Sequence, residues 1–541
     1  MNLRHSNIER LKDKQRIFDV LVLGGGVNGA VSAAALSGKG AKVALIDRGD
    51  FAGLTSSNSS NLAWGGIKYL ESYEFLLVNN LCKSRNHLMR NYPSTVKEIR
   101  FLTTIEKGFR YPVFLVYLST IFYWMIGRFF TSAPDFMTVK SMKKREPIIN
   151  TDNAAGGFEY SDAYLYDNDA RFVFNFVRSS MDYGCIAANY VESLGAVREN
   201  DYWLVNARDN ISGEEFQIRA KALINACGPY VDTHNQLSQQ KTEHRHLFSK
   251  GIHLIVDRVT EGNRILAFFA SDGRLFFVIP MGNKTCVGTT DTQVDDPNVG
   301  VTQEDRQFVL DNINDLLKLE TPITQEDVIA ERCGARPLAQ KGGDGVADWV
   351  KLSRKHAVDT NFEEQHLSIF GGKTTDCINV GDEVSELITK MGIELRYPNF
   401  KWYGEDDDTV RDEFYHQAEL MDLDAFTVKG SSEPLTQRLW RRYGGRALEL
   451  LEDIRQNPHQ AERLMKDAEY LRCEVEHTAR HEMITKLEDF LRRRSKITQV
   501  VRNEDIVDAP GLKEACKIFF GDEAEAKRQE YIQSISQKIP R

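Results

Sequence analysis

The stretch FDVLVLGGGVNGAVSAAALSGKGAKVALID, residues 18–47, decides the fold of this chain. An apolar run leads into a turn with three glycines in G-x-G-x-x-G spacing, a helix of small residues follows, and a second apolar run ends on an acid. Gly24 suits the tight turn, Gly26 lets the backbone approach a pyrophosphate, and Gly29 allows the helix to pack close to the strand. This order of elements predicts a βαβ unit that binds a dinucleotide. The unit by itself does not distinguish a nicotinamide from a flavin.

Two details of this unit indicate how a nucleotide would lie. The helix that begins after Gly26 offers unpaired N–H groups and partial positive charge to phosphates. Asp47, at the end of the second apolar run, is placed to accept hydrogen bonds from the adenosine ribose.

The next segment, residues 50–72, is rich in Ser, Asn and Gly. It is either a plain surface connection or a loop that covers the cofactor.

The composition describes a globular protein of several domains. At 541 residues the chain has room for roughly two to four domains of about 150 residues each. Hydrophobic residues make up 42% and charged residues 27%, which provides for a sizeable core. The net charge of -9 argues against a nucleic-acid partner, because it gives no general attraction to phosphate backbones.

Cysteine usage and the N-terminus bear on the compartment. The eight cysteines include no C-x-x-C pair, which favours a reducing, cytoplasmic compartment and argues against a cysteine metal site. Residues 1–16 have no apolar core of signal-peptide length and are interpreted as a polar tail.

His477 and His481 are four residues apart on a predicted helix, and a solvated charged face is favoured there over a metal pair. No metal site is therefore predicted.

One uncharged, aromatic stretch, YPVFLVYLSTIFYWMIG at residues 111–127, complicates this picture. Seventeen residues is about the lower limit for crossing a bilayer, and Pro112 shortens the usable helix. Buried core or the surface of a homodimer is the favoured reading. A helix lying in a membrane interface and a true span are the alternatives.

Beyond the βαβ unit the chain changes character twice. Residues 250–292 show short apolar runs separated by turn residues, which predicts antiparallel strands. Beyond about residue 396 an acidic linker leads into helical periodicity. We therefore predict an α/β (α+β overall) protein with a polar tail at 1–16, interleaved nucleotide and substrate domains at 17–395, and a helical domain at 396–541.

Several motifs together resemble the FAD-dependent (respiratory) glycerol-3-phosphate dehydrogenases. The resemblance runs over nearly the whole chain and rests on these segments: GGGVNGA at 24–30, TSSNSSNLAWGGIKYLE at 55–71, FEYSDAYLYDNDARFV at 158–173, ALINACGPYVD at 222–232, VGTTDT at 287–292, GARPL at 334–338, IFGGKTT at 369–375 and LEDFLRRRSKI at 487–497. In combination they are far more specific than the glycine fingerprint alone.

The resemblance implies a fold and a chemistry. The fold would be a Rossmann-like FAD domain of the two-dinucleotide-binding type, an antiparallel substrate-binding sheet and a C-terminal helical domain. The C2 hydrogen of sn-glycerol 3-phosphate would pass as hydride to the flavin, giving dihydroxyacetone phosphate, and quinone would reoxidise the flavin. A protein of this kind would dock peripherally on the cytoplasmic face of the membrane.

Matching motifs also imply site residues. Contacts to the substrate phosphate and hydroxyls would come from Lys68, Tyr69, Arg336, Arg354 and Lys373. We take His253, Lys373 and Arg336 as catalytic, with His253 or a neutral Lys373 accepting the C2 hydroxyl proton. An ordinary strand histidine is the alternative for His253. The residues expected to bind FAD are Gly24, Gly26, Asn28, Gly29, Asp47, Arg48, Thr55, Ser56, Ser57, Trp64, Gly65, Gly66, Val191, Ala226, Gly228, Gly372, Lys373 and Thr374.

One motif departs from the family. The usual S-S-K-L-I-H-G-G-x-R-Y-L reads SSNLAWGGIKYL here, so that Asn61, Trp64 and Lys68 replace a lysine, a histidine and an arginine. Lysine keeps the charge at 68 but loses the planar fork of arginine. Two alternatives therefore stand beside the family reaction. One is an FAD oxidase or dehydrogenase of a different hydroxy acid, amine or polyol, and the other is a non-catalytic, flavin-bound interaction protein.

Overall fold

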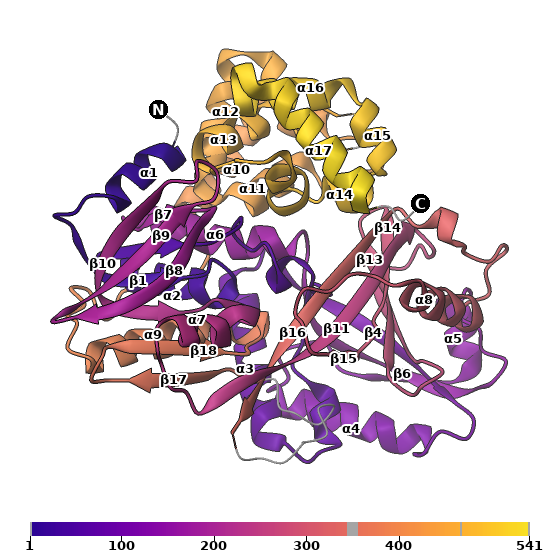
Figure 1. Ribbon diagram of the computed structural model, residues 1–541. Coiled ribbons are helices and arrows are strands. Elements are labelled where there is room, and N and C mark those ends of the chain that lie inside the picture. Colours follow the sequence, from indigo (N-terminus) through magenta and orange to yellow (C-terminus); the bar gives the residue numbers. More distant parts are fainter. Residues whose placement is uncertain (1–2, 343–354, 466–467, 539–541) are drawn as a thin grey trace.

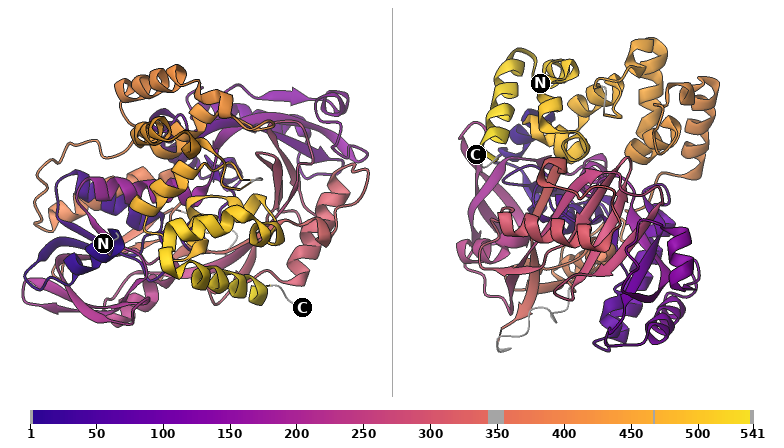
Figure 2. Two further views of the ribbon diagram at one scale, coloured as in Figure 1. Left: turned by 90° about the horizontal axis from the view of Figure 1, so that it is seen from above. Right: turned by 90° about the vertical axis from the view of Figure 1, so that its right-hand side faces the viewer.

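Two sheets lie side by side, and a group of helices covers both from one side (Figure 1). The turned views in Figure 2 show the same C-terminal helices, coloured orange to yellow, resting on the sheet-bearing body. The computed structural model describes residues 3–342, 355–465 and 468–538. The mixed α/β architecture expected from the sequence is confirmed.

The first sheet is built around β1 and has the strand order β17-β18-β10-β1-β2-β7. The five strands from β18 to β7 are parallel, β17 is antiparallel at one edge, and a β8–β9 hairpin folds back onto β10. The bounds are β1 Ile17–Leu23, β2 Val43–Ile46, β7 Ile186–Ala188, β8 Val191–Glu199, β9 Tyr202–Asp209, β10 Glu215–Asn225, β17 Ala357–Asn361 and β18 His366–Phe370.

Helix α2 (Val27–Gly38) connects β1 to β2 and completes the predicted βαβ unit. Its small side chains let it sit between β1 and two further helices, α6 (Asp169–Asp182) and α9 (Cys377–Lys390). Ala30, Ala33 and Ala34 are completely buried there. Eleven of the twelve residues of this helix are buried.

The second sheet has ten strands in the order β15-β11-β14-β13-β12-β4-β6-β3, with β16 paired to β11 and β5 to β6. All pairs are antiparallel except β4 with β12. The bounds are β3 Leu62–Ala63, β4 Val96–Glu106, β5 Asp135–Met137, β6 Ala154–Leu165, β11 His244–Asp257, β12 Arg264–Phe269, β13 Leu275–Met281, β14 Lys284–Gly288, β15 Thr292–Val294 and β16 Ala330–Lys341.

The aromatic stretch forms helix α4 (Val113–Ile126) at the edge of this second sheet (Figure 1). The prediction that this stretch is buried in the core is wrong, because only Thr120 and Tyr123 of the helix are buried. Phe114 is 61% exposed, and Leu118 and Phe122 are exposed as well. Among the described residues no helix is long and apolar enough to cross a membrane. The other helices near this sheet are α3 Phe75–Asn91, α5 Val139–Arg145 and α8 Gln303–Leu316.

The two ends of the chain are helical. Residues 3–11 of the supposed polar tail form α1 (Leu3–Leu11), which packs near β7 through Ile8 and Leu11 because both side chains are apolar. A short helix, α7 (Val231–Leu237), follows β10. The C-terminal helices are α10 Asp408–Leu420, α11 Leu435–Tyr443, α12 Ala447–Gln456, α13 Arg472–His481, α14 Ile497–Val500, α15 Asn503–Asp508, α16 Pro510–Phe520 and α17 Ala524–Lys538, with a π-helical turn at Asp489–Arg494.

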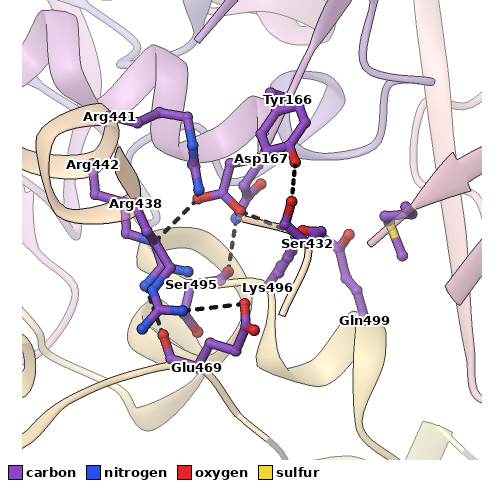
Figure 3. A network of polar contacts seen from close by, with 12 residues as sticks. Tyr166, Asp167, Ser432, Arg438, Arg441, Arg442, Glu469, Ser495, Lys496 and Gln499 are labelled. Carbon is purple, nitrogen blue, oxygen red and sulfur yellow. Dashed lines mark hydrogen bonds and ion pairs between the residues drawn. The ribbon is translucent and has the colours of Figure 1, made fainter. Parts of the chain in front are cut away.

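Buried ion pairs join the helical domain to the rest of the protein. Asp167, just before α6, lies 2.6 Å from Arg441, 3.2 Å from Arg442 and 3.3 Å from Lys496 (Figure 3). Burial alone would raise the pKa of the Asp167 carboxyl, but Arg441, Lys496 and Arg442 outweigh it and hold the pKa well below its ordinary range. The folded protein therefore needs this carboxylate ionised.

Asp167→Asn should lower the free energy of unfolding by about 3–5 kcal/mol, because it leaves buried cations without their partner. A carboxyl with a depressed pKa stabilises the fold above its unfolded pKa, about 3.9, and this stabilisation is lost as the pH falls toward the folded value. Denaturant unfolding between pH 7 and 3 should show a loss below about pH 4 that is shallower in the variant. Asp412→Asn, on an exposed carboxylate, is the control, and equal stability of the two variants would contradict the assignment.

Candidate active site

A cleft of about 750 Å³ lies at the carboxyl ends of β1 and β2 and reaches toward the second sheet. Ligands of doubly wound sheets bind in this position, outside the carboxyl ends of the strands. Of the residues predicted from the sequence, the cleft is lined by Gly24, Gly26, Asn28, Asp47, Arg48, Thr55, Ser56, Trp64, Tyr69, Ala226, Gly228, Arg336, Gly372, Lys373 and Thr374.

The glycine turn is compact in a way that excludes larger residues. A Cβ on Gly29 would lie 1.8 Å from the Gly24 carbonyl oxygen, and one on Gly24 would lie 2.5 Å from the Ala226 carbonyl oxygen. Gly24 also has φ +95°, which favours glycine. The turn is thus pressed against the end of β10, where Ala226 and Gly228 form the second strand-to-glycine turn. Gly29 has a packing role and does not itself line the cleft.

Asp47 shapes the nucleotide end of the cleft. Its carboxylate accepts hydrogen bonds from the N–H groups of Gly25 at 2.6 Å and Gly49 at 2.8 Å. Burial raises the pKa of this carboxyl, and the two backbone donors counteract that rise. Next to it, the Arg48 guanidinium lies 3.7 Å from the centroid of the Tyr230 ring.

Asn28 links the glycine turn to the segment after β18. Its Nδ2 donates to the Gly371 carbonyl oxygen at 2.9 Å, while its buried Oδ1 has no hydrogen-bond partner among the residues that the structure describes. Ser56 Oγ accepts from the Val27 N–H at 3.0 Å, at the start of α2. The orphaned amide oxygen, the helix N-terminus and the buried acid fit an adenine dinucleotide stretched along the cleft. These residues would hold FAD.

Part of the cleft lining is basic and aromatic. Lys373 Nζ lies 3.2 Å from the Tyr69 hydroxyl and 4.6 Å from the centroid of its ring. Lys68 Nζ lies 5.5 Å from the same centroid, although Lys68 is not among the lining residues. The structure therefore brings residues 68, 69 and 373 together around one ring.

Arg336, on β16, lines the same cleft. Its Nη2 donates to Thr289 Oγ1 at 3.0 Å, and its Nη1 lies 3.3 Å from Asp291. The guanidinium lies flat over Gly251, where a Cβ would come within 2.2 Å of Nη2. These contacts fix the orientation of a planar, permanently charged donor at the wall of the cleft.

His253 does not line the cleft. It lies on β11 between β14 and β16, is 1% exposed, and has neither ring nitrogen hydrogen-bonded to a described residue. Burial, followed by the charges of Arg332 and Arg336, lowers its pKa well below the ordinary value. Because β11 is buried continuously around it, this histidine is held in the core of the sheet and outside the cleft lining.

Trp64, which replaces the family histidine, lies in the cleft wall. Its indole N–H donates to the Tyr160 hydroxyl at 3.4 Å, and its carbonyl oxygen accepts from Thr375. The following Gly65 N–H donates to the buried carboxylate of Asp162, at 3.1 Å to one oxygen. The loop at 64–66 is thus anchored through its backbone.

Several predicted residues lie outside the cleft lining, and some lining residues were missed. Ser57, Gly65, Gly66 and Val191 do not line it, whereas Arg354 lies outside the described residues. Val191 begins β8 behind Asp47, to whose carbonyl oxygen its N–H donates. The missed lining residues include Asn58, Ser59, Tyr190, Lys486, Glu488 and Arg493. The segment LEDFLRRRSKI contained two of these, and the resemblance placed it in the helical domain without indicating that it reaches the cleft.

Comparison with known proteins agrees with the geometry. A protein-family model described as "FAD dependent oxidoreductase" matches residues 19–364. A second model, described as "C-terminal domain of alpha-glycerophosphate oxidase", matches residues 400–510. Because the first match covers more than half of the chain, the protein belongs to the FAD-dependent oxidoreductase family. FAD is its cofactor, as the sequence predicted.

Within that family the chain is similar to aerobic glycerol-3-phosphate dehydrogenases. That of Bacillus subtilis is 30% identical over 397 residues, which cover 72% of this chain and 70% of the relative. That of Staphylococcus epidermidis is 29% identical over 509 residues, 91% of this chain and 89% of the relative. A glycerol-3-phosphate dehydrogenase from Bacillus halodurans, solved with FAD, has the same fold, with a TM-score of 0.72 and 23% identity over 99% of this chain and 97% of that one.

Gly29→Ala should abolish retention of FAD, because the added Cβ collides with the Gly24 carbonyl and displaces α2 from the cleft. The ratio of flavin absorbance near 450 nm to protein absorbance in the purified protein measures this. Gly300→Ala is the matched control, since no atom lies within 4 Å of its added Cβ. Full flavin content in Gly29→Ala would show that the turn does not bind the cofactor.

Proposed function

We propose that this protein oxidises sn-glycerol 3-phosphate to dihydroxyacetone phosphate. The observation that carries the proposal is that Arg336, Lys373 and Tyr69 line the same cleft as the glycine turn, with Lys373 in hydrogen-bond reach of Tyr69. The names of the relatives from Bacillus subtilis and Staphylococcus epidermidis support the same substrate. Bound FAD supplies the hydride acceptor for the C2 hydrogen.

The basic end of the cleft suits a phosphate dianion. Desolvating such an anion is costly, and charge-assisted hydrogen bonds from an oriented guanidinium offset the cost. Arg336 provides that fork, while Lys68 adds a point charge beside the Tyr69 ring. Binding energy from the non-reacting phosphate can then position C2 for hydride transfer.

We assign the acceptor of the C2 hydroxyl proton to Lys373, acting as a neutral amine. His253 does not line the cleft, whereas Lys373 lines it and lies within hydrogen-bond reach of the Tyr69 hydroxyl. A general base must reach the proton that it removes, which the position of Lys373 allows for a substrate held by Arg336.

Arg336→Ala should lower kcat/KM for glycerol 3-phosphate roughly ten- to hundredfold, because each lost charge-assisted bond is worth about 1.5–3 kcal/mol. Anaerobic mixing with the substrate, followed by the fading of flavin absorption, measures the reductive step directly. Lys341→Ala, a charge removal further along β16, is the matched control. Wild-type kcat/KM in Arg336→Ala would exclude it from phosphate binding, and an unreduced wild-type flavin would exclude this substrate.

We further propose that quinone reoxidises the flavin and that α4 docks the protein peripherally on the cytoplasmic face of a membrane. The outward face of α4 is apolar, with Phe114, Leu118 and Phe122 all exposed. Exposed aromatic and aliphatic side chains of this kind are favoured at the membrane–water interface, where the rings lie at the level of the headgroups. The exposed lysines of α5, Lys140 and Lys144 among them, would add attraction to anionic lipid.

Replacing Phe114, Leu118 and Phe122 together by Ser should lower co-sedimentation with anionic lipid vesicles at least tenfold, because about 0.8 kcal/mol is lost per CH₂ no longer buried in lipid. Leu420→Ser, an equally exposed apolar residue on α10, is the control. A change in oligomeric state without a change in vesicle binding would identify the α4 face as a homodimer surface.

The proposed quinone acceptor has its own test. Rapid oxygen consumption by the enzyme without added quinone would identify an oxidase.

A further inference from the structure

His477 is a buried histidine that the proposed reaction does not use. It lies on α13, one turn before His481, and its side chain is 1% exposed. Neither of its ring nitrogens has a hydrogen-bond partner among the described residues. The solvated face expected from the sequence is therefore wrong for His477, because Tyr443 and α12 pack over it.

A carboxylate from the neighbouring helix completes a three-residue cluster. Glu449 on α12 places Oε2 3.6 Å from His477 Nδ1 and 3.8 Å from His481 Nε2. One ligand atom from each residue can be chosen so that all three lie within 4.8 Å of one another. Two ligands bound tetrahedrally to one zinc ion at 2.0–2.1 Å are about 3.3 Å apart, so only small side-chain movements separate the observed cluster from a coordinating one.

We propose that Glu449, His477 and His481 bind a divalent transition-metal ion of the zinc class. Two imidazoles one helical turn apart plus one carboxylate form a donor set suited to zinc and its neighbours in the first transition series. Magnesium and calcium prefer oxygen ligands and do not fit it. Glu449 and His481 are partly exposed, which gives the ion an entry path and leaves room for water as a fourth ligand.

The charges around the cluster are compatible with a cation. Arg446 is paired with Asp182, and Arg480 lies 2.7 Å from Asp453. Arg171 and Arg178 both face the buried Glu482, at 2.5 and 4.0 Å. Neither ring nitrogen of His477 is hydrogen-bonded to a described residue, so one of them can face a metal ion without breaking a contact.

The ion would act as a cross-link between α12 and α13. None of the three ligands is among the residues that line the cleft, so the site is separate from the substrate. Metal binding to the folded state alone stabilises a protein in proportion to the logarithm of the free metal concentration over Kd. We therefore expect zinc to raise the thermal midpoint of the helical domain and to leave flavin reduction unchanged.

The test uses the full-length, FAD-loaded protein after removal of metals with a chelator. Calorimetric titration with zinc chloride should show one ion per chain and a thermal midpoint that rises with zinc, whereas magnesium chloride should give neither. His481→Ala and Glu449→Gln should each weaken zinc binding at least tenfold. His459→Ala removes an exposed histidine that is also paired with a glutamate, Glu462, and should bind zinc like the wild type.

X-ray absorption at the zinc edge provides an independent readout. The proposal expects nitrogen and oxygen ligands at about 2.0–2.1 Å with two imidazoles in the wild type and one in His481→Ala. Zinc affinity unchanged in both His481→Ala and Glu449→Gln would overturn the proposal, as would a sulfur ligand at about 2.3 Å, which would place the ion on a cysteine. Because His481 and Glu449 are partly exposed, these variants decide the matter even if His477→Ala does not fold.

Discussion

The buried carboxylate of Asp50 holds the nucleotide cleft and the helical domain in register. It accepts hydrogen bonds from Arg493 at 2.6 Å and from two nitrogens of Arg494 at 2.8 Å, while Asn189 donates to it at 2.9 Å. Charges this deeply buried repay their desolvation only when every partner is in place. Asp50 and Arg493 both line the cleft, so the shape of the cofactor site depends on the docking of a domain that contributes little else to it.

The sequence predicted best what neighbouring residues determine. The contact of Gly29 with Gly24 and the connection of β1 to β2 by α2 are local, and spacing alone predicts them. The basic end of the cleft is different, because Tyr69, Arg336 and Lys373 come from three distant segments. Their meeting could be inferred only from resemblance to a family whose motifs occur in all three.

The sequence patterns did not predict which side chains of β11, α4 and α13 are buried. Strand β11 is buried continuously around His253, so it lacks the alternation of buried and exposed residues that marks a half-exposed strand. The sequence therefore did not indicate whether the His253 side chain faces the cleft. Helix α4 has the composition of a core helix, but Phe114, Leu118 and Phe122 on its outer face are exposed in the part of the chain that the structure describes. His477 and His481 share a helix face, yet only the first is covered. In each case the burial of a side chain depends on whether a segment distant in the sequence packs over it.

The long separations across the cleft have a consequence for biosynthesis. Asn28 meets Gly371 across 343 residues of chain, and Asp50 meets Arg493 across 443. Domains emerge from the ribosome N-terminal part first, at about 5–20 residues per second. The βαβ unit is therefore exposed on the nascent chain for tens of seconds before its partners are made, with its apolar helix uncovered. The complete cofactor cleft can therefore form only late in synthesis, after Arg493 has been made.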